Sequence, residues 1–274
     1  METTFNKKKN LAGFCLEVMG EEEVQAGLSL LRKLSAKEKE KWQKGNPVLF
    51  LVRPKINEKI LHQRFIKITL SCLKWQPGPN FLPEHFLSVL EGLSANEINE
   101  LITTMIPGYV SENMTDPWVL KLGLTIGMLK FLSVHTLRPS LRECSLEIAQ
   151  QWHLDEWQRG YCPICGGWPT MAKFFNENGA RKLYCPFCET EWRYQRIGCP
   201  ICQNQNSFFL SLAGIKGYEQ YRIYVCDHCK SYLKTVDERQ TGTIDLFCAD
   251  IATREIDELV IKEGYRLSFG RSAN

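Results

Sequence analysis

Four short segments decide the fold: YCPICGG at 161–167, YCPFCET at 184–190, GCPICQN at 198–204 and VCDHCKS at 225–231. They contain eight of the twelve cysteines of the chain, in four pairs of the form Cys-x-x-Cys. Two residues between the cysteines allow one tight turn to direct both sulfur atoms at a single ion, while backbone N–H groups of the turn stabilise the thiolates. A tetrahedral ion needs four ligands, so four turns predict two tetrathiolate metal sites.

The spacing between the turns indicates how they pair. Nineteen residues separate Cys165 from Cys185 and 23 separate Cys202 from Cys226, and each gap has the length of a short β-hairpin that returns the chain to the first turn. Only ten residues follow Cys188 before the next turn begins, which is typical of a connection between two modules. The predicted ligands are Cys162, Cys165, Cys185 and Cys188 for site one, and Cys199, Cys202, Cys226 and Cys229 for site two.

The residues leave the identity of the metal open, because zinc and a single iron ion both accept four thiolates in tetrahedral geometry. Gly166, directly after the second cysteine of the first turn, can adopt the left-handed backbone conformation without steric cost. Glu189, Gln203 and Lys230 occupy this position in the other turns, which we expect to be strained or to have another shape. His228 lies inside the fourth turn and is an alternative ligand, but four cysteines already complete the site, so we interpret it as a solvated loop residue.

Length and composition indicate a globular protein with a core beyond its metal sites. The chain has 274 residues, of which 44% are hydrophobic and 24% charged, and its net charge is only +3. Residues 161–200 hold five basic and three acidic side chains, and residues 201–240 hold five and four. A metal module that binds nucleic acid should show a basic excess, so this balance argues against such a partner.

We expect the protein to be cytoplasmic and not inserted in a membrane. The charged N-terminus leads into no clean apolar stretch, and the most apolar window, 118–134, is short and interrupted by Lys121 and Lys130. Cysteines in metal-binding turns without an export signal are typical of a reducing compartment. The remaining cysteines are expected to be buried core thiols: Cys15, Cys72, Cys144 and Cys248.

Helical periodicity and cap signals dominate the first part of the chain. Ser35 and Ser94 each begin a capping box, in which a hydroxyl and a carboxylate three residues later satisfy free N–H groups at the start of a helix. The predicted helices are 21–34, a short helix after Ser35, 55–74, a helix after Ser94, 117–136, one opened by Pro139, and a last helix at 250–262 capped by Asp250. Strands are predicted at 168–175, 181–184, 192–197, 207–212 and 221–225.

The predicted fold class is α+β, with an N-terminal helical bundle, two small β modules and a C-terminal helix. Modules of this size bury too little apolar surface to fold alone, so the metal must supply much of their stability. The predicted domains are 1–157 (helical), 158–197 (first metal module), 198–240 (second metal module) and 241–274 (C-terminal helix and tail).

These segments resemble the bacterial formate dehydrogenase accessory proteins of the FdhE type. The resemblance lies in CPICGGWP at 162–169, YCPFCETEW at 184–192, CPIC at 199–202, CDHCKSYLK at 226–234, ADI at 249–251 and EGYR at 263–266. It covers about residues 160–268, whereas the helical first half carries no recognisable motif. Lys230 departs from the family, which commonly has glycine after the fourth turn, and this leaves the shape of that turn open but not its two ligands.

The resemblance implies two rubredoxin-like or zinc-ribbon modules behind a helical domain. It implies an accessory protein, a chaperone and maturation factor rather than an enzyme. Such a protein binds the catalytic subunit of a molybdenum or tungsten selenocysteine formate dehydrogenase in the cytoplasm, before export or final assembly. It also implies iron binding and a redox-sensitive interaction with that partner. We therefore expect two metal ions, iron or zinc, each held by four cysteines, with no catalytic residues, no nucleic acid and no membrane insertion.

Other interpretations of the same residues remain open. A double zinc ribbon that binds nucleic acid would need a basic face with exposed aromatic side chains, and a rubredoxin-like electron carrier would need iron. Both ions could also be purely structural, as tetrathiolate zinc usually is. Candidate contacts to a partner are Glu189, Glu191, Trp192 and Tyr232, for which packing between the two modules is the alternative role.

Overall fold

The computed structural model describes residues 12–18, 27–30, 32–75, 82–83, 85–106, 116–175, 177–206, 208–213 and 215–267. The chain forms two compact units. The first, Met1–Leu31 with Arg53–Cys144, is here called the helical unit. The second, Arg32–Val52 with Ser145–Asn274, is called the sheet unit and contains all eight cysteines of the four turns.

The helical unit is built from amphipathic helices whose apolar faces form its core. Its described elements are a helical segment at 12–18, α4 (Glu58–Trp75), α5 (Phe86–Glu91), α6 (Ala95–Met105), α7 (Asp116–Leu122), most of α8 (Ile126–Ala149), and the short strands β1 (Leu28–Ser29) and β2 (Lys55–Ile56). The predicted stripe on α4 is buried: Leu61, Phe65, Ile68 and Cys72. Ser94 and Glu97 form the predicted capping box at the start of α6, with Glu97 Oε2 accepting from Ser94 N at 2.8 Å.

The prediction of one helix over 117–136 was wrong. Gly123, with φ +64°, ends α7 after two turns, because the left-handed conformation cannot continue a helix. The next helix, α8, then continues through Pro139, which was predicted to open a new helix. Leu137 and Leu141 on either side of the proline are completely buried, so core packing outweighs the hydrogen bond that the proline cannot make.

The helix predicted at 21–34 also differs from the structure. Leu28 and Ser29 form strand β1, which pairs antiparallel with β2. Residues 21–26 lie outside the described residues.

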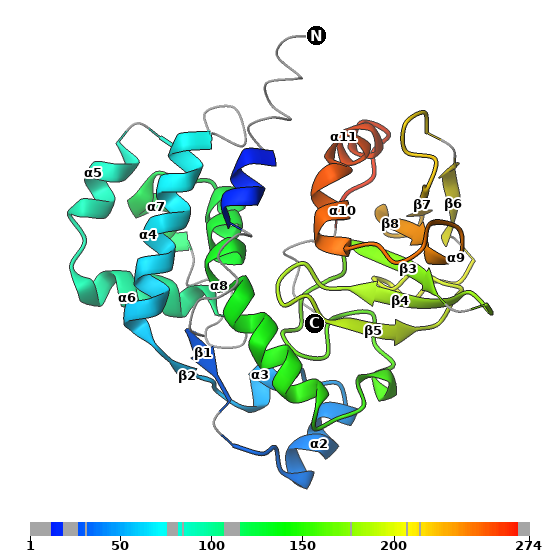
Figure 1. The fold of residues 1–274 in the computed structure, drawn as a ribbon, viewed down its shortest axis with the longest axis horizontal. Coiled ribbons are helices and arrows are strands. Elements are labelled where there is room, and N and C mark those ends of the chain that lie inside the picture. Colours follow the sequence, from blue (N-terminus) through cyan, green and yellow to red (C-terminus); the bar gives the residue numbers. More distant parts are fainter. Residues whose placement is uncertain are drawn as a thin grey trace. The chain divides into compact units, whose positions relative to one another are not determined.

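The sheet unit is organised around a single six-stranded sheet (Figure 1). Its strands are β3 (Met171–Phe175), β4 (Ala180–Tyr184), β5 (Glu191–Tyr194), β6 (Phe208–Ala213), β7 (Tyr221–Cys226) and β8 (Ser231–Asp237), in the order β5-β4-β3-β8-β7-β6. Each half is an antiparallel three-stranded meander, and the two halves join where β3 pairs parallel with β8.

This junction is the main difference from the expected arrangement of two small β modules. Strand β8 was not predicted from the sequence, because Lys234 and Asp237 interrupt the pattern of an apolar strand. All seven residues of β8 are nevertheless buried, and both charged side chains are paired. Main-chain pairing of Met171 with Lys234 therefore continues one module into the other.

In the described part of the chain, three helices follow the sheet: α9 (Glu238–Thr241), α10 (Leu246–Ala252) and α11 (Arg254–Lys262). The single helix predicted at 250–262, with Asp250 as its cap, was wrong. Asp245 caps α10 by accepting from Cys248 N at 2.7 Å, and Asp250 instead pairs with the fully buried Lys234 at 2.7 Å. This ion pair ties the helices to the middle of the sheet (Figure 1).

A segment from the N-terminal half of the sequence also belongs to the sheet unit. It contains α2 (Ala36–Gln43) and α3 (Val48–Leu51). The chain re-enters the unit at Ser145, within the last turns of α8, and continues through the short 3-10 helix η2 (Leu154–Glu156). The predicted capping box at Ser35 and Glu38 is present at the start of α2. Among the described residues, no helix is long and apolar enough to span a membrane.

Candidate metal centres

The four turns bring their eight cysteines together in two clusters, with the pairing that the spacing predicts. Site one consists of Cys162, Cys165, Cys185 and Cys188, and site two of Cys199, Cys202, Cys226 and Cys229. In each cluster the four sulfur atoms lie within 4.8 Å of one another. Site one lies in the first half of the sheet, and site two lies in the second.

The sulfur separations fit a tetrahedral ion. The Sγ atoms of Cys162 and Cys188 are 3.4 Å apart, and those of Cys202 and Cys226 are 3.6 Å apart. Four thiolates at about 2.3 Å from one ion, in tetrahedral geometry, are separated by about 3.8 Å. A disulfide would require about 2.0 Å, so these are free thiols arranged for zinc or iron.

The residue after each of the four turns has the left-handed backbone conformation. Gly166 follows the first turn with φ +76°, and Glu189, Gln203 and Lys230 follow the others with φ values of 55°, 61° and 55°. In the first turn Gly166 N donates to Cys162 O at 3.0 Å, and the corresponding bonds in the second and third turns are 3.0 Å and 2.9 Å long. The backbones of Glu189, Gln203 and Lys230 are therefore held in the left-handed region. Of the two alternatives that the sequence left open for these turns, strain or another shape, the structure has strain.

Site one is sealed by the segment that contains α2 and α3. Val48 N donates to Pro163 O at 3.0 Å and Leu49 N donates to Ile164 O at 3.0 Å. The first two N–H groups of α3 are therefore hydrogen-bonded to carbonyls of the first metal turn. Trp42 Nε1 also donates to Pro163 O, at 3.1 Å. These contacts leave every cysteine of site one at most 3% exposed.

A hydroxyl pair lies against one sulfur of site one. Thr190 Oγ1 is 2.9 Å from Cys188 Sγ, and Ser145 Oγ is 2.7 Å from Thr190 Oγ1. Because a metal-bound thiolate has no proton, the Thr190 hydroxyl must donate to the sulfur, and Ser145 then donates to Thr190. Both residues are buried, so this hydrogen bond stabilises the thiolate in a site without solvent.

Site two is more open than site one. Cys199 and Cys226 are completely buried, but Cys202 and Cys229 are only partly buried. Exposure of the sulfur ligands is one of the factors that set the reduction potential and exchange of a metal–thiolate site. The two sites thus have the same ligands in different surroundings.

Three thiols of site one, Cys162, Cys165 and Cys185, influence one another's ionisation. Burial raises the pKa of the Cys162 thiol, but hydrogen bonds with the neighbouring cysteines outweigh it, so its pKa lies well below the usual value. The contact with Cys162 is the largest cause that raises the pKa of Cys165, and burial together with Cys162 raises the pKa of Cys185. Ionisation of one thiol therefore disfavours ionisation of its neighbours. A bound cation would neutralise this repulsion and allow four thiolates to coexist.

The structure places the four candidate contact residues around site one and the sheet interior. Trp192 is completely buried and its Nε1 donates to Arg159 O at 2.9 Å. Tyr232 is also buried, and its hydroxyl donates to Asp257 Oδ1 at 2.8 Å. Neither aromatic side chain is exposed to a partner in this conformation.

The two acidic candidates are partly exposed. Glu191 Oε2 pairs with Lys173 Nζ at 2.9 Å, across the sheet. Glu189 holds the left-handed position after the second turn. Their role in partner binding stays a prediction.

Several residues that shape the sites were not identified from the sequence. Trp42 and the short apolar run after Pro47 gave a signal, because apolar side chains that end or follow the polar helix α2 need a surface to cover, but the sequence does not say which surface. Thr190 gave none, since a threonine two residues after a cysteine is common in any loop. Outside the turns, Cys15, Cys72 and Cys144 are buried as expected, whereas Cys248 on α10 is exposed.

Two family models match the sheet unit. The model of the FdhE central domain matches residues 161–196, and the model of the FdhE C-terminal domain matches residues 197–270. Site one lies in the first of these ranges and site two in the second.

Individual relatives agree with these matches. A protein FdhE homolog from Aquifex aeolicus is 27% identical over 179 residues, which is 64% of this chain and 58% of that protein. Protein FdhE from Escherichia coli K12 is 34% identical over 118 residues, 40% of this chain and 36% of that protein. The matches thus span less than two thirds of the length of either relative.

A solved structure supports the fold of the whole chain. The crystal structure of the FdhE protein from Pseudomonas aeruginosa superposes with a TM-score of 0.55 at 19% identity, covering 97% of this chain and 93% of that one. At this identity the likeness concerns the fold alone.

Proposed function

Because residues 161–270 match the models of the FdhE central and C-terminal domains, we propose that this chain belongs to the FdhE family and is a metal-binding accessory factor for formate dehydrogenase. In this proposal it binds the catalytic subunit of the enzyme in the cytoplasm, during assembly, as a dedicated chaperone. The observation that carries the proposal is the coincidence of one tetrathiolate cluster with each of the two FdhE domains.

The ligand set favours an accessory role over catalysis at the metal. A catalytic zinc site keeps one position for water or substrate, whereas four cysteines fill a tetrahedral ion completely. Each cluster supplies four such ligands. The ions would therefore order the two turns of each half of the sheet, and so shape a surface for a partner, rather than activate a substrate.

Iron in these sites would make the interaction redox-sensitive. A rubredoxin-like site changes its charge by one unit between ferric and ferrous iron, and the open site two would expose this change to a partner. Zinc has no accessible second oxidation state, and with zinc the sites would be structural.

Anaerobic co-purification tests this function. The tagged protein would be isolated from its native host under conditions that induce formate dehydrogenase, and bound proteins would be identified at moderate salt. The wild type should retain the catalytic subunit, and a C162S/C165S variant should lose it. Cys248→Ser provides the matched control, because Cys248 is exposed and lies outside both clusters, and it should retain the subunit. Absence of any dehydrogenase under reducing and oxidising conditions would contradict the proposal.

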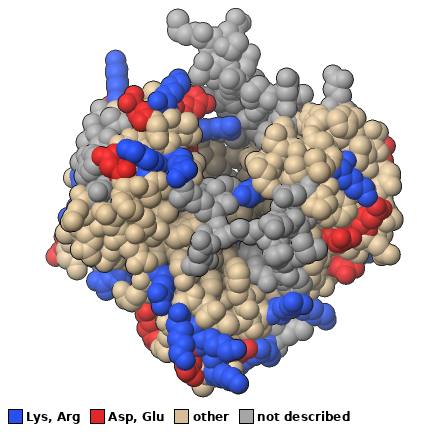
Figure 2. Space-filling view, turned by 180° about the vertical axis from the view of Figure 1, so that it is seen from behind, with Lys and Arg blue, Asp and Glu red and all other residues tan. Residues whose placement is uncertain are grey.

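Recovery of nucleic acid in the same experiment would favour a double zinc ribbon instead. Such a protein needs a continuous basic surface. On the face drawn in Figure 2, Lys and Arg lie in several separate groups, most of them beside Asp or Glu. This distribution, together with the small net charge of +3, makes nucleic acid the weaker candidate.

An electron carrier is the second candidate, favoured by the partial exposure of Cys202 and Cys229. Electron transfer requires a redox centre close to the surface, which site two would provide. A reversible one-electron couple in the purified iron protein would support this function. A colourless protein that contains only zinc would end it.

A further inference from the structure

The two halves of the sheet begin with the same tetrapeptide but differ in what covers it. Cys-Pro-Ile-Cys occurs at 162–165 and again at 199–202. In the first copy Ile164 is completely buried beneath α3, whereas in the second copy Ile201 is partly exposed. The side of the sheet unit around the second copy is therefore accessible.

A pocket lies next to this second copy. It has a volume of about 340 Å³, and its wall includes Arg181 on β4, Tyr194 on β5, and Gln195, which follows β5. Arg181 Nη2 donates to Gly198 O at 2.9 Å, and Gly198 directly precedes Cys199 of site two. The pocket and the start of the second metal turn thus share one wall.

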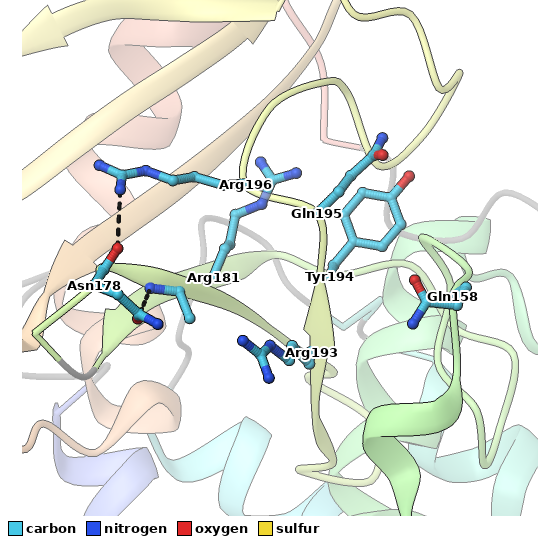
Figure 3. A pocket seen from close by; sticks show the side chains of 8 residues that line it. Gln158, Asn178, Arg181, Arg193, Tyr194, Gln195 and Arg196 are labelled. Atoms are coloured by element: carbon cyan, nitrogen blue, oxygen red, sulfur yellow. Dashed lines mark hydrogen bonds between the residues drawn. The ribbon is translucent and has the colours of Figure 1, made fainter.

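Positive charge dominates the pocket. Three arginines contribute to its lining, Arg181, Arg193 and Arg196, with amides from Gln158 and Gln195, and the described lining contains no Asp or Glu. In the view of Figure 3 the arginines lie on one side of the pocket, with Tyr194, Gln195 and Gln158 on the other. Such a wall offers many N–H donors and attracts anions.

The arginines differ in how firmly they are held. Arg181 is 2% exposed and its guanidinium lies over the Tyr194 ring at 5.3 Å, so it forms a fixed floor. Burial lowers the pKa of Arg181 to about 10, which still leaves it a cation at neutral pH. Arg193 and Arg196 are exposed, and Arg196 is oriented by donating to Asn178 O at 3.0 Å.

We propose that this arginine-lined pocket binds carboxylate side chains of an acidic segment of a protein partner. Planar carboxylates match the forked geometry of guanidinium groups, and exposed arginines at the rim can meet a side chain that projects from another protein. A nucleotide base would need an exposed aromatic face, and Tyr194 is only 7% exposed with Arg181 already against it. The partner would be the dehydrogenase subunit, and this part of the inference rests on the proposed function.

Titration of the metal-loaded full-length protein with a hexaglutamate peptide, followed by calorimetry at low salt, tests the pocket itself. The wild type should bind the peptide, with an affinity that falls as salt is added, and should not bind hexalysine. Arg193→Glu should weaken binding about tenfold or more, because it replaces an attraction by a repulsion. Lys216→Glu changes the net charge equally at an exposed position outside the pocket, and should change the affinity by about twofold or less.

Three results would overturn the proposal. The first is a wild-type protein that does not bind hexaglutamate at low salt. The second is an equal loss of affinity in R193E and K216E, which would show a general charge effect. The third is that inorganic phosphate binds the wild type more tightly than hexaglutamate does, and that R193E weakens this phosphate binding. This result would make the pocket a phosphate site.

The identity of the partner is tested separately with the dehydrogenase catalytic subunit. If this subunit binds the wild type and competes with hexaglutamate, both the pocket and the partner are supported. If hexaglutamate binds as expected but the subunit neither binds nor competes, the pocket stands and the proposed function fails.

Discussion

At the scale of single residues, the residue after each metal turn has a left-handed backbone, which is unfavourable for any residue but glycine. Glu189, Gln203 and Lys230 all have positive φ values, although only Gly166 adopts such a conformation freely. The left-handed conformation costs an ordinary residue roughly 1–2 kcal/mol. The metal ligands on either side of the turn hold these residues there.

Gln203→Gly should therefore stabilise the metal-loaded protein. The released strain of about 1–2 kcal/mol exceeds the extra entropy that glycine loses on folding, about 0.5–1 kcal/mol, so the net gain is on the order of 0.5–1 kcal/mol. The thermal midpoint should rise by about 2–4 °C for each kcal/mol, at fixed metal concentration. Gly166→Ala should lower the midpoint, because its Cβ would approach Phe50 at 3.1 Å in a strained backbone. An unchanged or lower midpoint for Q203G would refute the strain.

Thr190→Val should weaken metal binding at site one. The substitution keeps the shape of the side chain but removes the hydroxyl next to Cys188 and leaves the buried Ser145 hydroxyl without its acceptor. Loss of such a hydrogen bond to a ligand typically reduces metal affinity about 10–100-fold. Competition with a chromophoric chelator measures this. Ser145→Ala leaves the bond to Cys188 intact and should have a smaller effect, so equal losses in both variants would show that the bond between Thr190 and Cys188 is not what stabilises the site.

At the scale of elements, α3 acts as a cover for the first metal turn. Its first two N–H groups have no acceptor within the helix. They donate instead to carbonyl oxygens of that turn. A four-residue helix has little stability of its own, so the turn and the helix order each other.

Val48→Pro should loosen this cover without unfolding α3. Proline is accepted at the first position of a helix, and Pro47 already has the extended backbone that must precede it, but the N–H to Pro163 O is lost. The expected cost is about 0.5–1.5 kcal/mol, with faster release of metal from site one. Val48→Ala retains the N–H and provides the control for the lost side chain. If V48A released metal from site one as fast as V48P, the hydrogen bond would have no part in sealing the site.

The sequence predicted elements whose signals are local and missed those that depend on distant partners. The capping boxes at Ser35 and Ser94 were correct, because each needs only two residues that are three positions apart. Strand β8 was missed, because Lys234 is compatible with a buried strand only when Asp250 and Asp257 lie beside it. These carboxylates come from helices that follow the strand, so no local pattern could indicate them.

The same distinction between local and distant signals applies to the two metal sites. Their ligands were predictable, because two cysteines in one turn must point at one ion. Their different surroundings were not, because the cover of site one comes from Trp42 and α3, more than a hundred residues earlier in the chain. The partial exposure of Ile201 among the described residues is equally a property of the folded chain.

At the scale of the whole molecule, the structure holds two sites with the same ligands and unequal access. Every ligand of site one is at most 3% exposed, while Cys202 and Cys229 of site two meet solvent. A chelator can reach a partly exposed sulfur directly, but must wait for α3 to open before it reaches site one.

Metal release to excess chelator should therefore occur in two phases of about one equivalent each. Site two should empty first, and the fast phase should disappear in a C202S/C229S variant. Continued chelation should then unfold the sheet unit, since metal binding and folding of small tetrathiolate modules are coupled. Absorbance of the chelator complex and near-ultraviolet circular dichroism would follow the two steps. A single phase of two equivalents would show that α3 does not protect its site.

The parallel pairing of β3 with β8 has a consequence for biosynthesis. Met171 pairs with Lys234, so about sixty residues must be translated before the edge of β3 finds its partner. At 5–20 residues per second this takes roughly 3–12 s. During that interval the nascent chain can already hold the first ion between its two turns, but it carries a bare strand edge of the kind that recruits other chains. The ribosome-bound protein is therefore most prone to aggregation after its first site has closed and before its second half has emerged.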